Sequence, residues 1–61
     1  MTVRELIQVL QAIQDQDTTV VIGDGAHPET WLIVSGAVPR RIARVSDDHA
    51  IAGSEPAIEI V

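Results

Sequence analysis

The sequence predicts an α+β fold in which one N-terminal helix packs on a small, mostly antiparallel sheet of three to five strands. Three observations predict it. An apolar stripe with helical spacing opens the chain, short β-branched runs follow, and the connections between them are too short for crossover helices. The eight valines and eight isoleucines suit a pleated sheet because both are stiff at χ1. Residues 1–61 should form a single mini-domain.

The helix is predicted from the first segment, MTVRELIQVLQAIQDQD. Thr2 is followed three residues later by Glu5, which is the pattern of a capping box. Apolar side chains then recur at helical spacing and form one stripe: Val3, Leu6, Ile7, Leu10 and Ile13. Asp15 and Asp17 are poor helix residues and mark the exit. We therefore expect a helix from Val3 to Gln14 or Gln16.

The rest of the chain predicts strands separated by turns. The runs TTVVI, TWLIV and RRIARV indicate strands at residues 18–22, 30–34 and 40–45, with a short strand at 50–52 and a last one at 57–61. The stretch GDGAHPE should be a loop, where glycine permits a positive φ. SGAVP should end the second strand, because Pro39 cannot donate to a strand ladder.

Both faces of the second predicted strand are apolar, since Trp31 and Ile33 alternate with Leu32 and Val34. A helix of about 12 residues is about 18 Å long and can cover only one side of a sheet. Either the sheet curls over itself, or the second face meets another copy of the chain, and we favour the copy. The interface of this homo-oligomer is expected to contain Trp31, Leu32, Ile33, Val34 and Val21.

Composition disfavours several classes of partner. The net charge is −5 and there is no lysine, whereas a protein that binds the DNA backbone without sequence preference is basic. The longest apolar run, WLIV, is far shorter than the roughly 20 residues of a membrane span. No basic start leads into an apolar stretch, so nothing indicates a signal peptide. We expect a cytoplasmic protein.

The residues that could carry chemistry form no recognised constellation. The glycines of GDG lead into a strand, whereas a phosphate cradle needs a helix N-terminus. His27 and His49 lack the spacing of metal ligands, so no metal site is expected. There is no Cys, Tyr or Lys, and no serine lies in a G-x-S-x-G elbow. We expect neither an enzyme nor a cofactor.

Three of the four arginines lie within PRRIARV: Arg40, Arg41 and Arg44. Strand alternation places Arg40 and Arg44 on one face and Arg41 on the other. Guanidinium groups match phosphate and carboxylate oxygens, and Trp31 could stack on a base, so an oligomer could hold a nucleotide between these residues. The alternatives are ion pairs with carboxylates on neighbouring strands and contact with an acidic protein partner.

The opening MTVRELIQVLQAIQDQDTTVVI resembles a loose group of short bacteriophage and bacterial proteins that begin M-T-V-x-E-L-I/L-x-x-L and continue into a β-branched strand. The ending AIEIV is similar to theirs as well. The resemblance implies a helix-and-sheet mini-domain of a mobile element, and it supplies no functional residues. Where that group has a proline-containing break after the helix, this chain has QDQD.

Three functions remain open on the sequence. The first is a non-catalytic homo-oligomer that binds a bacterial or phage protein stoichiometrically, in host takeover or anti-defence. The second is a nucleotide-sequestering protein that uses the arginines and Trp31. The third is an acidic nucleic-acid mimic, although the acidic residues form no visible row.

Overall fold

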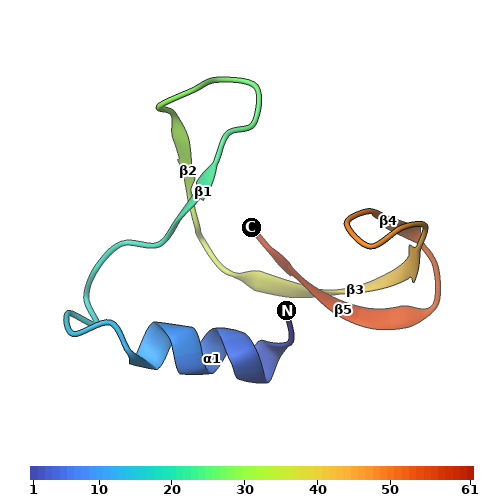
Figure 1. Ribbon diagram of the computed structural model, residues 1–61, viewed down its shortest axis with the longest axis horizontal. Helices are drawn as coiled ribbons and strands as arrows, with labels where there is room; N and C mark the ends of the chain where they lie inside the picture. Colours follow the sequence, from blue (N-terminus) through green and yellow to red (C-terminus); the bar gives the residue numbers. More distant parts are fainter.

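The computed structural model describes all 61 residues and contains one helix and five strands. In chain order these are α1 (Val3–Gln11), β1 (Val21–Gly23), β2 (Trp31–Ile33), β3 (Ala37–Arg44), β4 (Ala50–Ala52) and β5 (Glu55–Ile60). Every strand pairing is antiparallel, which confirms the α+β class and the antiparallel character. The strands form two sheets, however, ordered β1-β2 and β4-β3-β5 (Figure 1). The expected packing of the helix on one sheet is not confirmed, because α1 makes no extended contact with either sheet.

The start of α1 confirms the predicted capping box. The amide of Glu5 donates to the Thr2 hydroxyl oxygen at 3.2 Å, and the amide of Thr2 donates to the Glu5 carboxylate at 3.2 Å. The helix ends at Gln11, earlier than predicted, with Ala12 as its C-cap. The Gln16 side chain folds back and donates to the Leu10 carbonyl at 3.0 Å, and the same carbonyl also accepts from the amide of Ile13.

The capping box should make helix content depend on pH. Hydrogen bonds from the side chain and then the backbone of Thr2 hold the pKa of Glu5 below its ordinary value. A lowered pKa means that the stabilisation is present above the ordinary pKa and is lost as the pH falls through the lowered value. We expect the far-UV circular dichroism of the helix to weaken on acidification below about pH 4. Glu5→Gln keeps the hydrogen bond and should remove this Glu5-dependent step, and an unchanged acid transition in that variant would contradict the assignment.

The β1–β2 hairpin is a two-stranded antiparallel ladder in which Val21, Ile22 and Gly23 face Ile33, Leu32 and Trp31. Two further backbone bonds extend it, from the amide of Val34 to the Val20 carbonyl and from the amide of Asp24 to the Thr30 carbonyl. The predicted strand at residues 18–22 therefore starts later than expected. The amide of Thr18 instead donates to the Asp15 carbonyl and closes a turn after the helix.

The connection between β1 and β2 is a loop, as predicted, but glycine does not provide its unusual backbone angle. No glycine has a positive φ, and the one residue in the left-handed region is Glu29, with φ of 60°. The loop is organised by Asp24, whose carboxylate accepts from the amide of Ala26 at 3.1 Å and whose carbonyl accepts from the amide of His27. This is the local hydrogen bonding that makes aspartate a turn residue.

The second strand ends before SGAVP, as predicted, but the break is shorter than expected, because β3 already begins at Ala37 and contains Pro39. Gly36 and Val61 exchange both of their backbone hydrogen bonds. Because bonded and non-bonded pairs alternate along an antiparallel ladder, the pair Pro39↔Ile58 and the pair Arg41↔Pro56 are both non-bonded. Each proline nitrogen therefore faces away from the neighbouring strand, where no donor is required.

After β3 the chain turns back and pairs with β3 twice. β4 lies along one edge of β3, and β5 lies along the other edge. Ala50–Ala52 pairs with Arg44–Ile42 on one edge, and Glu55–Ile60 pairs with Ile42–Ala37 on the other edge. Only at Ile42 does β3 have partners on both sides, so the sheet is two strands wide along most of its length. We call this unit, β3 with β4 and β5, the ribbon.

Gly53 makes the change of sides possible. Its amide donates to the Arg41 carbonyl at 3.2 Å. A Cβ atom on Gly53 would lie 2.5 Å from both the Cβ and the backbone nitrogen of Ala43, and 2.6 Å from the backbone carbon of Ile42. Separations below 3.0 Å do not occur for real Cβ atoms, so only glycine can cross β3 here without displacing its backbone.

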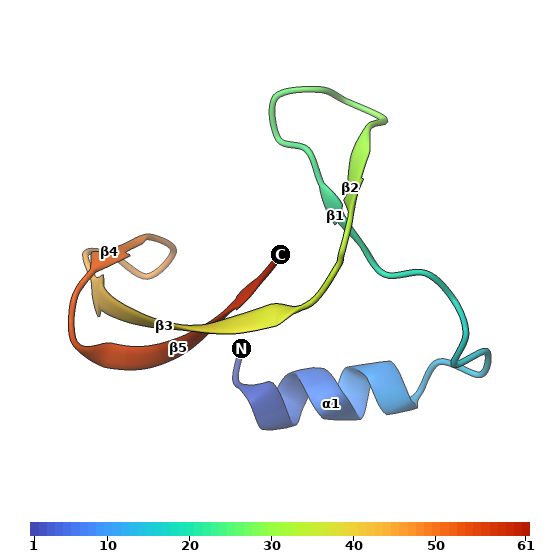
Figure 2. The same ribbon diagram turned by 180° about the vertical axis from the view of Figure 1, so that it is seen from behind.

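The three units, α1, the hairpin and the ribbon, do not enclose a core. None of the 61 residues is buried. The Cα radius of gyration is 13.5 Å, whereas about 10 Å is typical of a compact domain of this length. Figures 1 and 2 show the hairpin projecting away from α1 and from the curved ribbon. No helix is long and apolar enough to cross a membrane.

Candidate functional site

The hairpin is apolar on both faces, as predicted for its second strand. Residues that pair across the ladder share a face, so Val21, Trp31 and Ile33 lie on one side. Alternation places Leu32 and Val34 on the other side, beside Val20 and Ile22. The hairpin is exposed on both sides, with Trp31 57% and Ile33 72% exposed. Of the residues that we expect at an oligomer interface, only Val34 is half-buried in the single chain, and the other four are exposed.

The helix and the residue after its C-cap present a second uncovered apolar surface, which we call the helix stripe: Val3, Leu6, Ile7 and Leu10 of α1, and Ile13. Leu6 is half-buried, and the other four are exposed. An amphipathic helix normally gains most of its stability by packing its apolar face against a neighbour. The helix stripe has no such neighbour within the chain.

The ribbon has two chemically different faces, and one of them carries two exposed ion pairs. The Arg40 Nε atom lies 2.6 Å from a carboxylate oxygen of Glu59, and the Arg44 Nε atom lies 3.2 Å from one of Glu55. Val38, Ile42 and Ala57 lie on this same face and are half-buried.

The opposite face of the ribbon is apolar and open. Strand alternation and register place seven apolar residues on it, which we call the apolar ribbon face: Ala37, Pro39, Ala43, Ile51, Pro56, Ile58 and Ile60. Ile51 is 60% and Ile58 50% exposed. The one charged side chain on this face is that of Arg41, which donates to the Ser54 carbonyl at 3.3 Å.

The structure does not bring the arginine cluster and Trp31 together in one chain. Trp31 belongs to the hairpin, and the three arginines belong to the ribbon. Two of these arginines already pair with glutamates, as the alternative to a nucleotide site predicts. A phosphate would have to displace both glutamates, so the geometry favours a structural role for Arg40 and Arg44.

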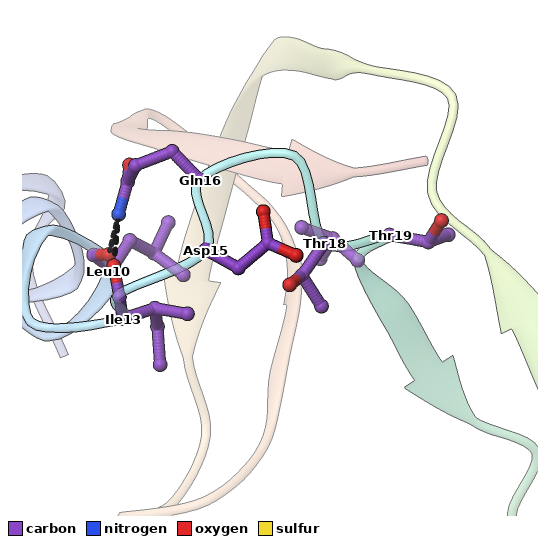
Figure 3. A pocket seen from close by; sticks show the side chains of 7 residues that line it. Leu10, Ile13, Asp15, Gln16, Thr18 and Thr19 are labelled. Atoms are coloured by element: carbon purple, nitrogen blue, oxygen red, sulfur yellow. Dashed lines mark hydrogen bonds between the residues drawn. The ribbon is translucent and has the colours of Figure 1, made fainter.

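A hollow at the elbow between α1 and β1 was not anticipated from the sequence (Figure 3). It measures about 320 Å³ and is lined by Leu10, Ile13, Asp15, Gln16, Thr18, Thr19 and Val20. Its geometry depends on local polar contacts: the Gln16 bond to Leu10 and a bond from the amide of Asp17 to the Asp15 carboxylate at 3.0 Å. The repeated Gln and Asp of QDQD are the sequence signal for these turns.

Polar side chains also gather in the turn between β3 and β4. The Asp48 carboxylate accepts from the Ser46 hydroxyl at 2.8 Å and lies 2.6 Å from the His49 Nδ1 atom. The Ser46 bond, and then the His49 contact, lower the pKa of Asp48. The aspartate contacts both other residues and the histidine does not lie between them, so this is not the order of a hydrolase triad.

The remaining acidic residues lie in separate connections rather than in a row. Asp15 and Asp17 follow α1, and Asp24 and Glu29 lie in the hairpin loop. No three His, Asp or Glu side chains gather closely enough to hold a metal ion.

Comparison with known proteins adds no further assignment. No protein-family model matches the chain, and no curated protein and no solved structure shows significant similarity to it.

Proposed function

We propose that this chain is a small non-catalytic binding protein that acts as a homo-oligomer, by stoichiometric contact with a bacterial or phage protein in the cytoplasm. One observation carries the proposal. The helix stripe, both faces of the hairpin and the apolar ribbon face are exposed over most of their residues, and no residue is buried. Surfaces of this kind mark association rather than solvent-facing structure.

The exposed area supports the homo-oligomer quantitatively. A folded monomer of 6.6 kDa should expose about 3,900 Å². The chain exposes 5571 Å², an excess of about 1,700 Å² per copy. Two copies would thus remove about 3,400 Å² from water, within the roughly 2,000–5,000 Å² of obligate homodimers.

The binding role follows from the chemistry that is and is not available. Backbone and ion-pair contacts already engage the ribbon arginines, and the charged residues elsewhere lie in the first turn of α1 or in loops. The resemblance of the opening to short phage proteins supports a mobile-element accessory role in host takeover or anti-defence. Such proteins need contact surfaces rather than a reaction centre.

The test is a titration of the purified chain against a partner captured from bacterial lysate. We expect a sharp end point at a fixed molar ratio of partner to oligomer, with no turnover of small molecules. Thr30→Asp changes an exposed polar position just before β2 and is the surface control. It should bind the partner with the same end point as the wild-type chain. Substrate turnover by amounts of chain far below those of the substrate would contradict a stoichiometric role.

A further inference from the structure

The edges of the ribbon are poorly suited to recruiting another strand. Pro39 and Pro56 occupy non-bonded pairs, so each proline nitrogen faces an open edge. Proline at an edge removes a donor that an added strand would need, and natural sheets use it in this way to prevent edge-to-edge pairing. A partner should therefore approach the ribbon on its face.

The helix stripe matches the apolar ribbon face in size. The nine residues of α1 extend about 14 Å, and the six residues of β5 extend about 20 Å. A helix about 10 Å wide covers two strands about 5 Å apart. Both surfaces are apolar, and within one chain both lack a partner.

The charges at the apolar ribbon face and at the C-terminal end of α1 are complementary as well. Arg41 is the one charged residue on the apolar ribbon face, and its only hydrogen bond there goes to a backbone carbonyl. The C-terminal end of α1 carries no basic residue in its last turn and is followed by Asp15 and Asp17. The helix dipole adds negative charge at that end. Arg41 and this acidic helix end are complementary.

We propose that the apolar ribbon face of one copy receives the helix stripe of a second copy, reciprocally, with Arg41 facing the acidic end of the partner helix. The inference rests on the proposed homo-oligomer and names one pair of surfaces that meet in it, beside the hairpin faces. Reciprocal exchange is the arrangement that a two-fold dimer requires, because each copy offers the same pair of surfaces. It also covers the helix with a sheet, which a single chain does not achieve.

Cysteine cross-linking tests the proposal. The chain has no native cysteine, so only the introduced cysteines can form disulfides. Ile7→Cys lies on the helix stripe and Ile58→Cys on the apolar ribbon face. We expect a disulfide-linked heterodimer when chains carrying one change each are mixed, allowed to exchange subunits and oxidised. Gln8→Cys mixed with Ala57→Cys is the matched control, because both positions lie on the opposite faces, and it should give no such product.

Each other outcome overturns the docking. Ile7→Cys homodimers would indicate helix-on-helix association, and an intramolecular disulfide in the double variant at high dilution would indicate that each helix covers its own ribbon. An oligomeric mass without the cross-link would refute this docking and leave the homo-oligomer intact, whereas a monomeric mass would refute both. If the cysteine variants do not fold, Arg41→Glu keeps the test open. As a single change in the otherwise wild-type chain, Arg41→Glu should weaken association several-fold. Unchanged association would count against the proposal.

Discussion

Ile33→Asp should abolish assembly and, with it, cooperative folding. Ile33 is 72% exposed in the single chain, so a purely monomeric protein would tolerate a polar residue there almost without cost. In an oligomer the same side chain is removed from water, and its loss should cost about 1.5–3 kcal/mol per copy. Burial of the new carboxylate adds a further penalty. Sedimentation and thermal unfolding at matched concentration measure both effects.

Thr30→Asp provides the comparison for Ile33→Asp. It introduces the same charge three residues earlier, at an exposed polar position just before β2. We expect this variant to keep the oligomeric mass and a melting temperature close to the wild type. Equal behaviour of the two variants would show that the hairpin faces take no part in assembly.

Gly53→Ala should have the second large effect, because it inserts one methyl group where the returning strand crosses β3. The new Cβ would meet the backbone of Ile42 and Ala43 at 2.5–2.6 Å. Relief requires the crossing to move apart, which should lower the free energy of unfolding by about 1–3 kcal/mol. The expected readout is a lower midpoint in urea together with a weaker strand signal in circular dichroism.

Gly36→Ala is the control for the crossing, since it changes glycine to alanine at the start of the same ribbon. No atom lies within 4 Å of a Cβ placed there, and Gly36 does not have a positive φ. It should be neutral or stabilising by about 0.4–1 kcal/mol, because alanine restricts the unfolded chain. If Gly53→Ala proved as stable as Gly36→Ala, β4 and β5 could not change sides at Ile42 as described.

Local features of the fold could be read from the sequence, whereas its long-range pairings could not. The capping box of Thr2 and Glu5 depends on residues three apart, and it forms as predicted. The place of Pro39 inside β3 depends on which pairs of the ladder are bonded, and a register is not visible in one strand. The crossing at Gly53 likewise depends on β4 and β5 pairing with opposite edges of β3, and the sequence of one segment does not show that pairing.

The candidate surfaces also include some features that one strand determines and others that depend on the pairing between strands. The two-faced apolar strand Trp31–Ile33 was predictable because alternation is a property of the strand itself. The ion pairs of Arg40 with Glu59 and of Arg44 with Glu55 were foreseen only as a type, since their partners are fixed by the pairing of β3 with β5. The separation of helix, hairpin and ribbon was not foreseen, because the sequence pattern says which faces are apolar and not what covers them.

The most direct test is the molar mass of the chain across a wide range of concentration, measured by analytical ultracentrifugation together with the emission of Trp31. We predict a multiple of 6.6 kDa at high concentration, and on dilution a joint loss of mass, of helix signal and of the blue-shifted Trp31 emission. A mass of 6.6 kDa at every concentration, with cooperative unfolding and Trp31 already shielded from water, would contradict the claim that copies of the chain complete one another's core.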